Sequence, residues 1–100
     1  MHTQQELIDT LTPIFRQYPI KRAAIFGSYA RGDATNDSDL DILVELDYTK
    51  GIAGLFYNFW DELESTIGLK TDLVTVDSLS TTPQKFRERV LQEMRYIYEI

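Results

Sequence analysis

The 100-residue sequence contains no cysteine, one histidine and no apolar run of membrane-spanning length. Without cysteine, neither disulfides nor thiolate metal sites can form. The one histidine, His2, lies at the N-terminus, so we expect no imidazole catalysis. No signal-peptide pattern opens the chain, and the sequence therefore predicts a cytoplasmic protein that does not cross a membrane.

Basic residues are also scarce, with 10 Lys and Arg against 16 Asp and Glu and a net charge of −6. Nonspecific binding of nucleic acid depends on basic surface, so we expect no direct nucleic-acid partner. A nucleotide site is not excluded, because one metal ion and a few donors suffice locally. The length and the 43% hydrophobic content predict one folded domain over residues 1–100.

Apolar spacing and turn residues predict alternating helices and strands. The expected elements are a helix from Gln4 that Pro13 kinks or restarts, strands 20–26, 40–46 and 71–76, a short helix 28–31, a loop 47–54, a helix 52–67, a turn 77–81 and a last helix with Thr82 as N-cap and Pro83 as its first residue. The tail 94–100 fits either a short edge strand or a helix end. This order predicts an α/β (α+β) fold, a small sheet with helices packed on it.

The residues that carry chemistry gather in one stretch, GSYARGDATNDSDLDILV, from Gly27 to Val44. Gly27 follows an apolar strand and allows a sharp turn and a close approach to a ligand. Ser28 offers a hydroxyl at the start of the short helix, and free amides at a helix N-terminus bind phosphate. Arg31 has two interpretations, a phosphate contact or an ion pair with Asp33 or Asp37.

Two acids close this stretch. In a strand, Asp39 and Asp41 project to the same face, while Leu40 and Ile42 project to the other. Two neighbouring carboxylates repel, and a hard cation such as Mg²⁺ turns that repulsion into attraction. Asp39 can instead be a turn residue, but Asp41 interrupts an apolar run and has no such explanation.

The pattern Gly27-Ser28, Ala30-Arg31-Gly32 and Ser38-Asp39-x-Asp41 resembles the signature of the polymerase-β-type nucleotidyltransferases, and within them the minimal nucleotidyltransferases of bacteria and archaea. The resemblance extends over about residues 20–93. It includes GLKTDLVT at 68–75, similar to the family strand that carries a third carboxylate, here Asp72. Read alone, Asp72 is equally well a solvated acid at a strand edge.

The resemblance implies the nucleotidyltransferase palm, a mixed sheet with its acids on one open face. It implies transfer of a nucleoside monophosphate with two Mg²⁺ ions and ATP as substrate. Asp39, Asp41 and Asp72 would then be catalytic metal ligands, and Asp72 would also accept the proton of the attacking hydroxyl. Gly27, Ser28 and Arg31 would bind the nucleotide phosphates.

Larger relatives carry further domains that hold the acceptor, and we expect no room for one in this chain. The acceptor would then be held by a partner or by a second copy, in a hetero-oligomer or a homodimer. The resemblance implies an antitoxin that transfers AMP to a tyrosine of a helical HEPN-type toxin. Two alternatives remain: an antitoxin that acts by binding alone, and a small-molecule nucleotidyltransferase of the aminoglycoside-modifying kind.

Overall fold

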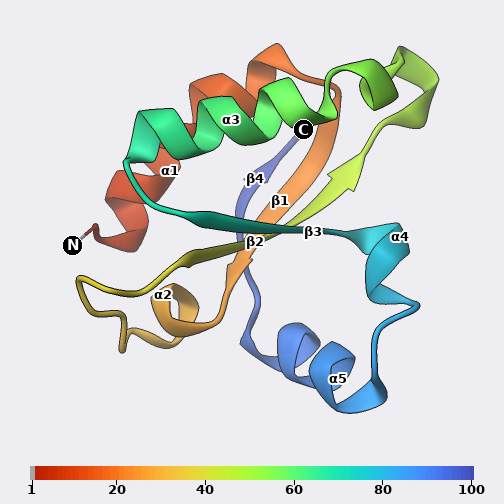
Figure 1. Cartoon of the computed structure of the whole chain (residues 1–100). Helices are drawn as coiled ribbons and strands as arrows, with labels where there is room; N and C mark the ends of the chain where they lie inside the picture. The colour runs from red at the N-terminus through yellow and green to blue at the C-terminus, as the bar shows by residue number, and fades with distance from the viewer. Residues whose placement is uncertain (1) are drawn as a thin grey trace.

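The computed structural model describes residues 2–100 as one sheet with helices on both faces (Figure 1). The strands are β1 (Ile20–Phe26), β2 (Leu40–Leu46), β3 (Thr71–Thr75) and β4 (Arg95–Glu99). The helices are α1 (Gln4–Gln17), α2 (Ser28–Arg31), α3 (Phe56–Ile67), α4 (Val76–Leu79) and α5 (Gln84–Glu93), with 3₁₀ turns η1 (Tyr48–Lys50) and η2 (Ile52–Gly54). Over these described residues, no helix combines the length and the apolar character that a bilayer crossing requires.

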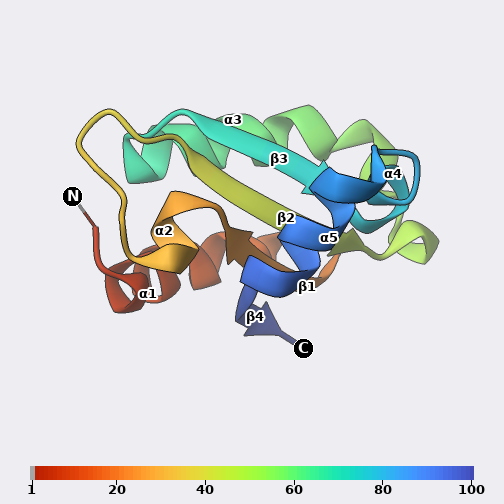
Figure 2. The ribbon, with the colours of Figure 1, turned by 90° about the horizontal axis from the view of Figure 1, so that it is seen from below.

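The sheet is mixed, with strand order β3-β2-β1-β4. Strand β1 runs antiparallel to both β2 and β4, whereas β2 and β3 are parallel. Parallel neighbours need a crossover, and α3 supplies it. Helices α1 and α3 lie on one face and α5 on the other, as the view from below shows (Figure 2). The predicted α/β (α+β) fold with a small mixed sheet is confirmed.

The first helix begins as its sequence predicts. Thr3 and Glu6 form a capping box, each side chain bonding the other's backbone amide. The helix then runs through Pro13 without ending, although proline removes one helix hydrogen bond. Leu11 and Phe15 are fully buried on either side of it, so packing outweighs the missing bond.

Alternation in β2 separates two apolar layers. The larger layer lies between the sheet and helices α1 and α3, and it includes Leu40, Ile42 and Val44 as predicted. The smaller layer lies under α5, where Leu43 packs with Ala24, Phe26, Leu79 and Val90. The same strand face that carries Leu43 also carries Asp41, so α5 borders the acids of the site.

Three predicted boundaries are wrong. Strand β3 ends at Thr75, and the expected strand end and turn are instead the short helix α4, because Thr75 and Ser78 form a capping box. Pro83 is the N-cap of α5, not its first residue, and the hydroxyl of Thr82 donates to the carbonyl of Leu79 instead. The helix expected from residue 52 begins as the 3₁₀ turn η2, with α3 starting at Phe56.

The tail forms a strand, one of the two structures its pattern allowed. Strand β4 pairs antiparallel with β1 at the edge of the sheet, with one register shift between Ala23 and Ala24. Its central residue, Ile97, joins the core against α1. The return of the tail to β1 places α5, which precedes it directly, over the acidic face.

Candidate active site

Two carboxylates meet where β2 and β3 run side by side. In the parallel register Asp41 lies directly beside Asp72, and neighbouring strands are about 4.8 Å apart. Asp41 is partly buried and Asp72 is exposed. The start of β3 is held by α3, since the Trp60 indole donates to the carbonyl of Thr71 (2.8 Å) and Glu64 accepts from its amide (2.8 Å). The structure therefore joins two acids that lie 31 positions apart in the sequence.

The pKa of Asp41 is raised from its ordinary value of 3.8 to about 6. Burial is the largest cause, followed by the charges of Asp72 and Asp39 and a hydrogen bond with Asp72. Arg89 on α5 acts in the opposite direction and lowers this pKa. A carboxyl group whose charge is disfavoured by burial and by two other acids is suited to bind a cation.

This pKa shift gives a stability prediction for the protein without ligands. The folded state binds a proton at Asp41 more readily than the unfolded state, so stability should fall as pH rises from about 4 to about 6 and then level off. Asp41→Asn removes this penalty. The variant should match the unaltered protein near pH 4 and be more stable by about 1 kcal/mol above pH 7, allowing for solvent at a partly exposed group.

Denaturant unfolding of both proteins across this pH range measures the effect. Asp37→Asn is the matched control, because Asp37 is exposed and its carboxylate makes no ion pair or hydrogen bond among residues 2–100. A stabilisation by Asp41→Asn that is the same at every pH, or that Asp37→Asn shares, would contradict the assigned cause.

Asp39 lies just before β2, after a turn that hydrogen bonds between Thr35 and Ser38 stabilise. Within that turn the amide of Thr35 donates to the Ser38 hydroxyl (2.8 Å) and the amide of Ser38 to the carbonyl of Thr35 (3.1 Å). Asp39 is partly exposed and affects Asp41 through its charge. Across residues 2–100, no three acidic or histidine side chains already enclose a space for one metal ion.

Gly27 lies against the carboxylate of Asp41. Its φ of 72° and ψ of −151° belong to a backbone region that only glycine adopts readily. A Cβ atom built on Gly27 would lie less than 3.0 Å from Oδ2 of Asp41, a separation that Cβ atoms in proteins essentially never show. The bend therefore places the residue before α2 against the carboxylate of Asp41, and the partly exposed Ser28 follows it directly.

Arg31 closes α2 and forms two ion pairs. Its Nε lies 3.1 Å from Asp33, one of the two partners that the sequence suggested, and its Nη1 lies 2.7 Å from Glu93 on α5. Asp37 is not a partner of Arg31 in these described residues. The contact of Arg31 with phosphate stays a prediction. With 43% of its side chain exposed, Arg31 is accessible to a ligand.

Reasoning from the sequence missed the contribution of α5 to this site. Glu93 pairs with Arg31, and Arg89 acts on Asp41, yet neither belongs to the signature stretch. The alternation of acids and bases in α5 is also typical of an ordinary solvated helix. No signal in the sequence distinguishes these two residues from the others.

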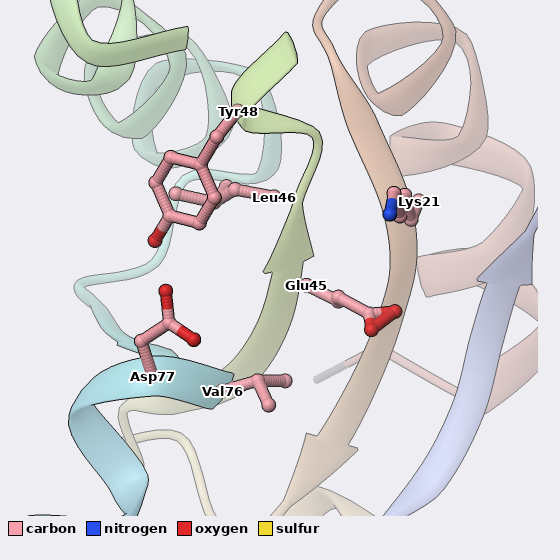
Figure 3. Close-up of a pocket in the computed structure, with 6 residues that line it drawn as sticks. All are labelled: Lys21, Glu45, Leu46, Tyr48, Val76 and Asp77. Carbon is pink, nitrogen blue, oxygen red and sulfur yellow. The ribbon is translucent and has the colours of Figure 1, made fainter.

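A hollow of about 230 Å³ opens elsewhere, lined by Lys21, Glu45, Leu46, Tyr48, Val76 and Asp77. Figure 3 shows the Tyr48 hydroxyl directed toward Asp77, and that contact raises the pKa of Tyr48. Glu45 is already paired with Arg22 (3.0 Å). Since Glu45 follows Asp41 by four strand positions, this hollow is about 13 Å from the acid pair and is separate from it.

Comparison with known proteins shows the family to which the chain belongs. The family model for polymerase beta nucleotidyltransferases matches residues 9–100. The chain belongs to this nucleotidyltransferase family. Its sequence is 34% identical to protein adenylyltransferase MntA of Thermococcus cleftensis over 97% of this chain and 98% of that protein. It is 36% identical to a Methanocaldococcus jannaschii protein named among the protein adenylyltransferases, over 88% of this chain and 90% of that one.

Solved structures share the fold of this nucleotidyltransferase. A minimal nucleotidyltransferase superposes with a TM-score of 0.71 at 28% identity, covering 94% of this chain and 95% of that one. A toxin–antitoxin structure with AMP-PNP gives 0.69 at 22% identity, with 93% and 73% covered. A Shewanella oneidensis complex of a tri-AMPylated HEPN toxin with MNT antitoxin gives 0.65 at 18% identity, with 98% and 74% covered.

Proposed function

We propose that this nucleotidyltransferase transfers AMP from ATP to a hydroxyl group, with Mg²⁺, and that the acceptor is a tyrosine of a HEPN-type toxin. The observation that carries the proposal is the pairing of Asp41 with Asp72 beside the Gly27 bend. The family and the relatives named protein adenylyltransferases support the type of reaction. The complex with a tri-AMPylated HEPN toxin supports the acceptor class.

The acids fit Mg²⁺ in number and in chemistry. Mg²⁺ prefers oxygen ligands and in nucleotide sites takes one or two carboxylates, with phosphate oxygens and water completing its shell. Asp41 and Asp72 provide such a pair, and Asp39 is a third carboxylate for a second ion. This explains why residues 2–100 need no closed cluster of three acids before the nucleotide arrives. When bound, the ions would neutralise phosphate charge and align the attacking and leaving oxygens.

Other residues of the chain would bind the phosphates and accept the proton. The amides at the start of α2 and the Ser28 hydroxyl would bind the β- and γ-phosphates. The acceptor oxygen would attack the α-phosphorus, and the bond from that phosphorus to the bridging oxygen would break, so that pyrophosphate leaves. Asp72, the more exposed acid, would take the proton of the attacking hydroxyl.

The proposed partner follows from the shape of the site. Acids on a sheet face need a second surface to hold an acceptor hydroxyl and to exclude water. In the chain described here α5 borders that face, while Asp72 at the edge strand β3 stays exposed. A protein acceptor can supply the missing surface, and the acidic net charge of −6 favours it over nucleic acid.

Co-expression of this chain with a HEPN-type toxin, followed by mass spectrometry of that partner, tests the proposal. We expect added AMP units on a tyrosine, and none when Asp72→Asn replaces the unaltered chain. A partner that is inhibited but carries no AMP would favour an antitoxin that acts by binding alone. Transfer to an aminoglycoside, with no change in the partner, would favour small-molecule modification.

A further inference from the structure

Arg89 of α5 lies near the acid site, and two aromatic rings that pack on each other connect it to that site. Asp41 lies directly opposite Phe26 across the β1–β2 pair, so both side chains project to the same face. The ring of Phe26 packs on Phe86, with centroids 6.1 Å apart. The Arg89 guanidinium lies over Phe86, 5.6 Å from its centroid.

The guanidinium donors of Arg89 bond no other group among residues 2–100. Its nearest acid, Glu93, is 3.9 Å from its Nε, which is longer than a hydrogen bond. Arg87, two positions earlier, differs because it donates to the carbonyls of Ser80 (3.3 Å) and Thr82 (3.1 Å). The side chain of Arg89 makes no hydrogen bond within residues 2–100, and 65% of it is exposed.

Glu93 lies between two guanidinium groups that flank the site. Its Oε2 accepts from Arg31 at 2.7 Å, while its Oε1 is buried without a hydrogen-bond partner in the described chain and faces Arg89. Arg31 ends α2 and Arg89 comes from α5, so the two cations approach from different elements. Only 14% of the Glu93 side chain is exposed, which limits how far the three groups can separate.

We propose that Arg89 is a phosphate-binding residue of this site and contacts the triphosphate of the bound nucleotide. The proposal rests on the proposed function and adds to it a residue 50 positions from Asp39. A triphosphate beside three carboxylates needs positive charge in addition to metal. A guanidinium with free N–H groups matches phosphate oxygens in geometry and charge. Its stacking on Phe86 orders the side chain before the nucleotide arrives.

Affinity for ATP and for inorganic triphosphate, each with Mg²⁺, tests this role by isothermal titration. Arg89→Met keeps an unbranched apolar side chain but removes the guanidinium, and should weaken the binding of both ligands about tenfold. Arg89→Lys keeps the charge but loses the forked guanidinium, so its affinities should lie between those of the unaltered protein and those of Arg89→Met. Lys85→Met is the matched control, because it removes one exposed charge from the same helix and should change neither affinity more than about twofold.

Each other outcome has a definite meaning. Equal losses in Arg89→Met and Lys85→Met would show a general charge effect and overturn the proposal. A loss for ATP alone, or no measurable binding of triphosphate to the unaltered protein, would mean that Arg89 does not bind phosphate. If the unaltered protein binds no ATP, the proposed function fails; if it binds ATP and Arg89→Met is unchanged, only the role of Arg89 is lost.

Discussion

Asp41→Asn should abolish AMP transfer in a protein that is still folded. Asparagine keeps the shape of aspartate but removes the charge that would hold a cation beside Asp72. Metal ions supply several kcal/mol of charge stabilisation in such displacements, so we expect a loss of about 10³-fold or more. The rate of label transfer from ATP to the partner protein, measured in single turnover, gives this number directly.

The distinguishing feature is that activity and stability should change in opposite directions. The carboxyl of Asp41, with its pKa raised to about 6, disfavours the folded state at neutral pH, so the inactive variant should unfold at a higher denaturant concentration than the active protein. A residue needed only for packing would lose both properties together. Asp37→Asn, which changes the same charge in the preceding loop, should keep both. Transfer that persists in Asp41→Asn would remove the basis for a metal site here.

Strand β2 was predictable because its side chains alternate between two faces. Leu40, Ile42 and Val44 face the larger apolar layer as their spacing indicates, and this alternation fixes which side Asp41 must take. Gly27 was predictable for a similar local reason, since its bend directly follows an apolar strand. These features depend on neighbours in the sequence, and the signature stretch contains them all.

The register between β2 and β3 could not be read from local pattern. A parallel pair is joined through a crossover, and shifting one strand by a single residue would send its acid to the other face. The structure sets the register with contacts from α3: Trp60 and Glu64 both bond Thr71, the residue before Asp72. These side chains have an ordinary helical spacing in the sequence, so their role appears only in three dimensions.

The position of α5 over the acidic face could not be predicted from the sequence either. Its helix is visible as a pattern, but its place over the acidic face depends on the tail pairing with β1, which the sequence left open between two structures. For that reason Arg89 and Glu93 were not recognised as neighbours of the site. The error at Thr75 is smaller and arises because the Thr75 side chain caps the start of α4. The error at Pro83 is a shift of one residue, and no side-chain hydrogen bond among the described residues caps α5 there.

Gly27→Ala should lower transfer about 10²-fold and also destabilise the protein. Alanine at a φ of 72° and a ψ of −151° costs about 1–3 kcal/mol in backbone strain. Its Cβ would in addition overlap Oδ2 of Asp41, a group whose orientation the proposed mechanism requires. A displacement of about 1 Å at a reacting centre can cost 10²-fold in rate, so the catalytic loss should exceed what reduced stability explains.

Gly32→Ala is the control that separates these two effects. Gly32 also has a positive φ, 86°, at the other end of α2, but a Cβ there would meet nothing within 4 Å. Its ψ of 12° makes it left-handed helical, so alanine there should cost only about 1 kcal/mol of stability and keep the transfer rate within about threefold. Measuring unfolding of Gly27→Ala in an Asp41→Ala background completes the test. If the overlap with Asp41 contributes, the stability cost of Gly27→Ala should fall in that background, whereas an unchanged cost would place the defect in the backbone alone.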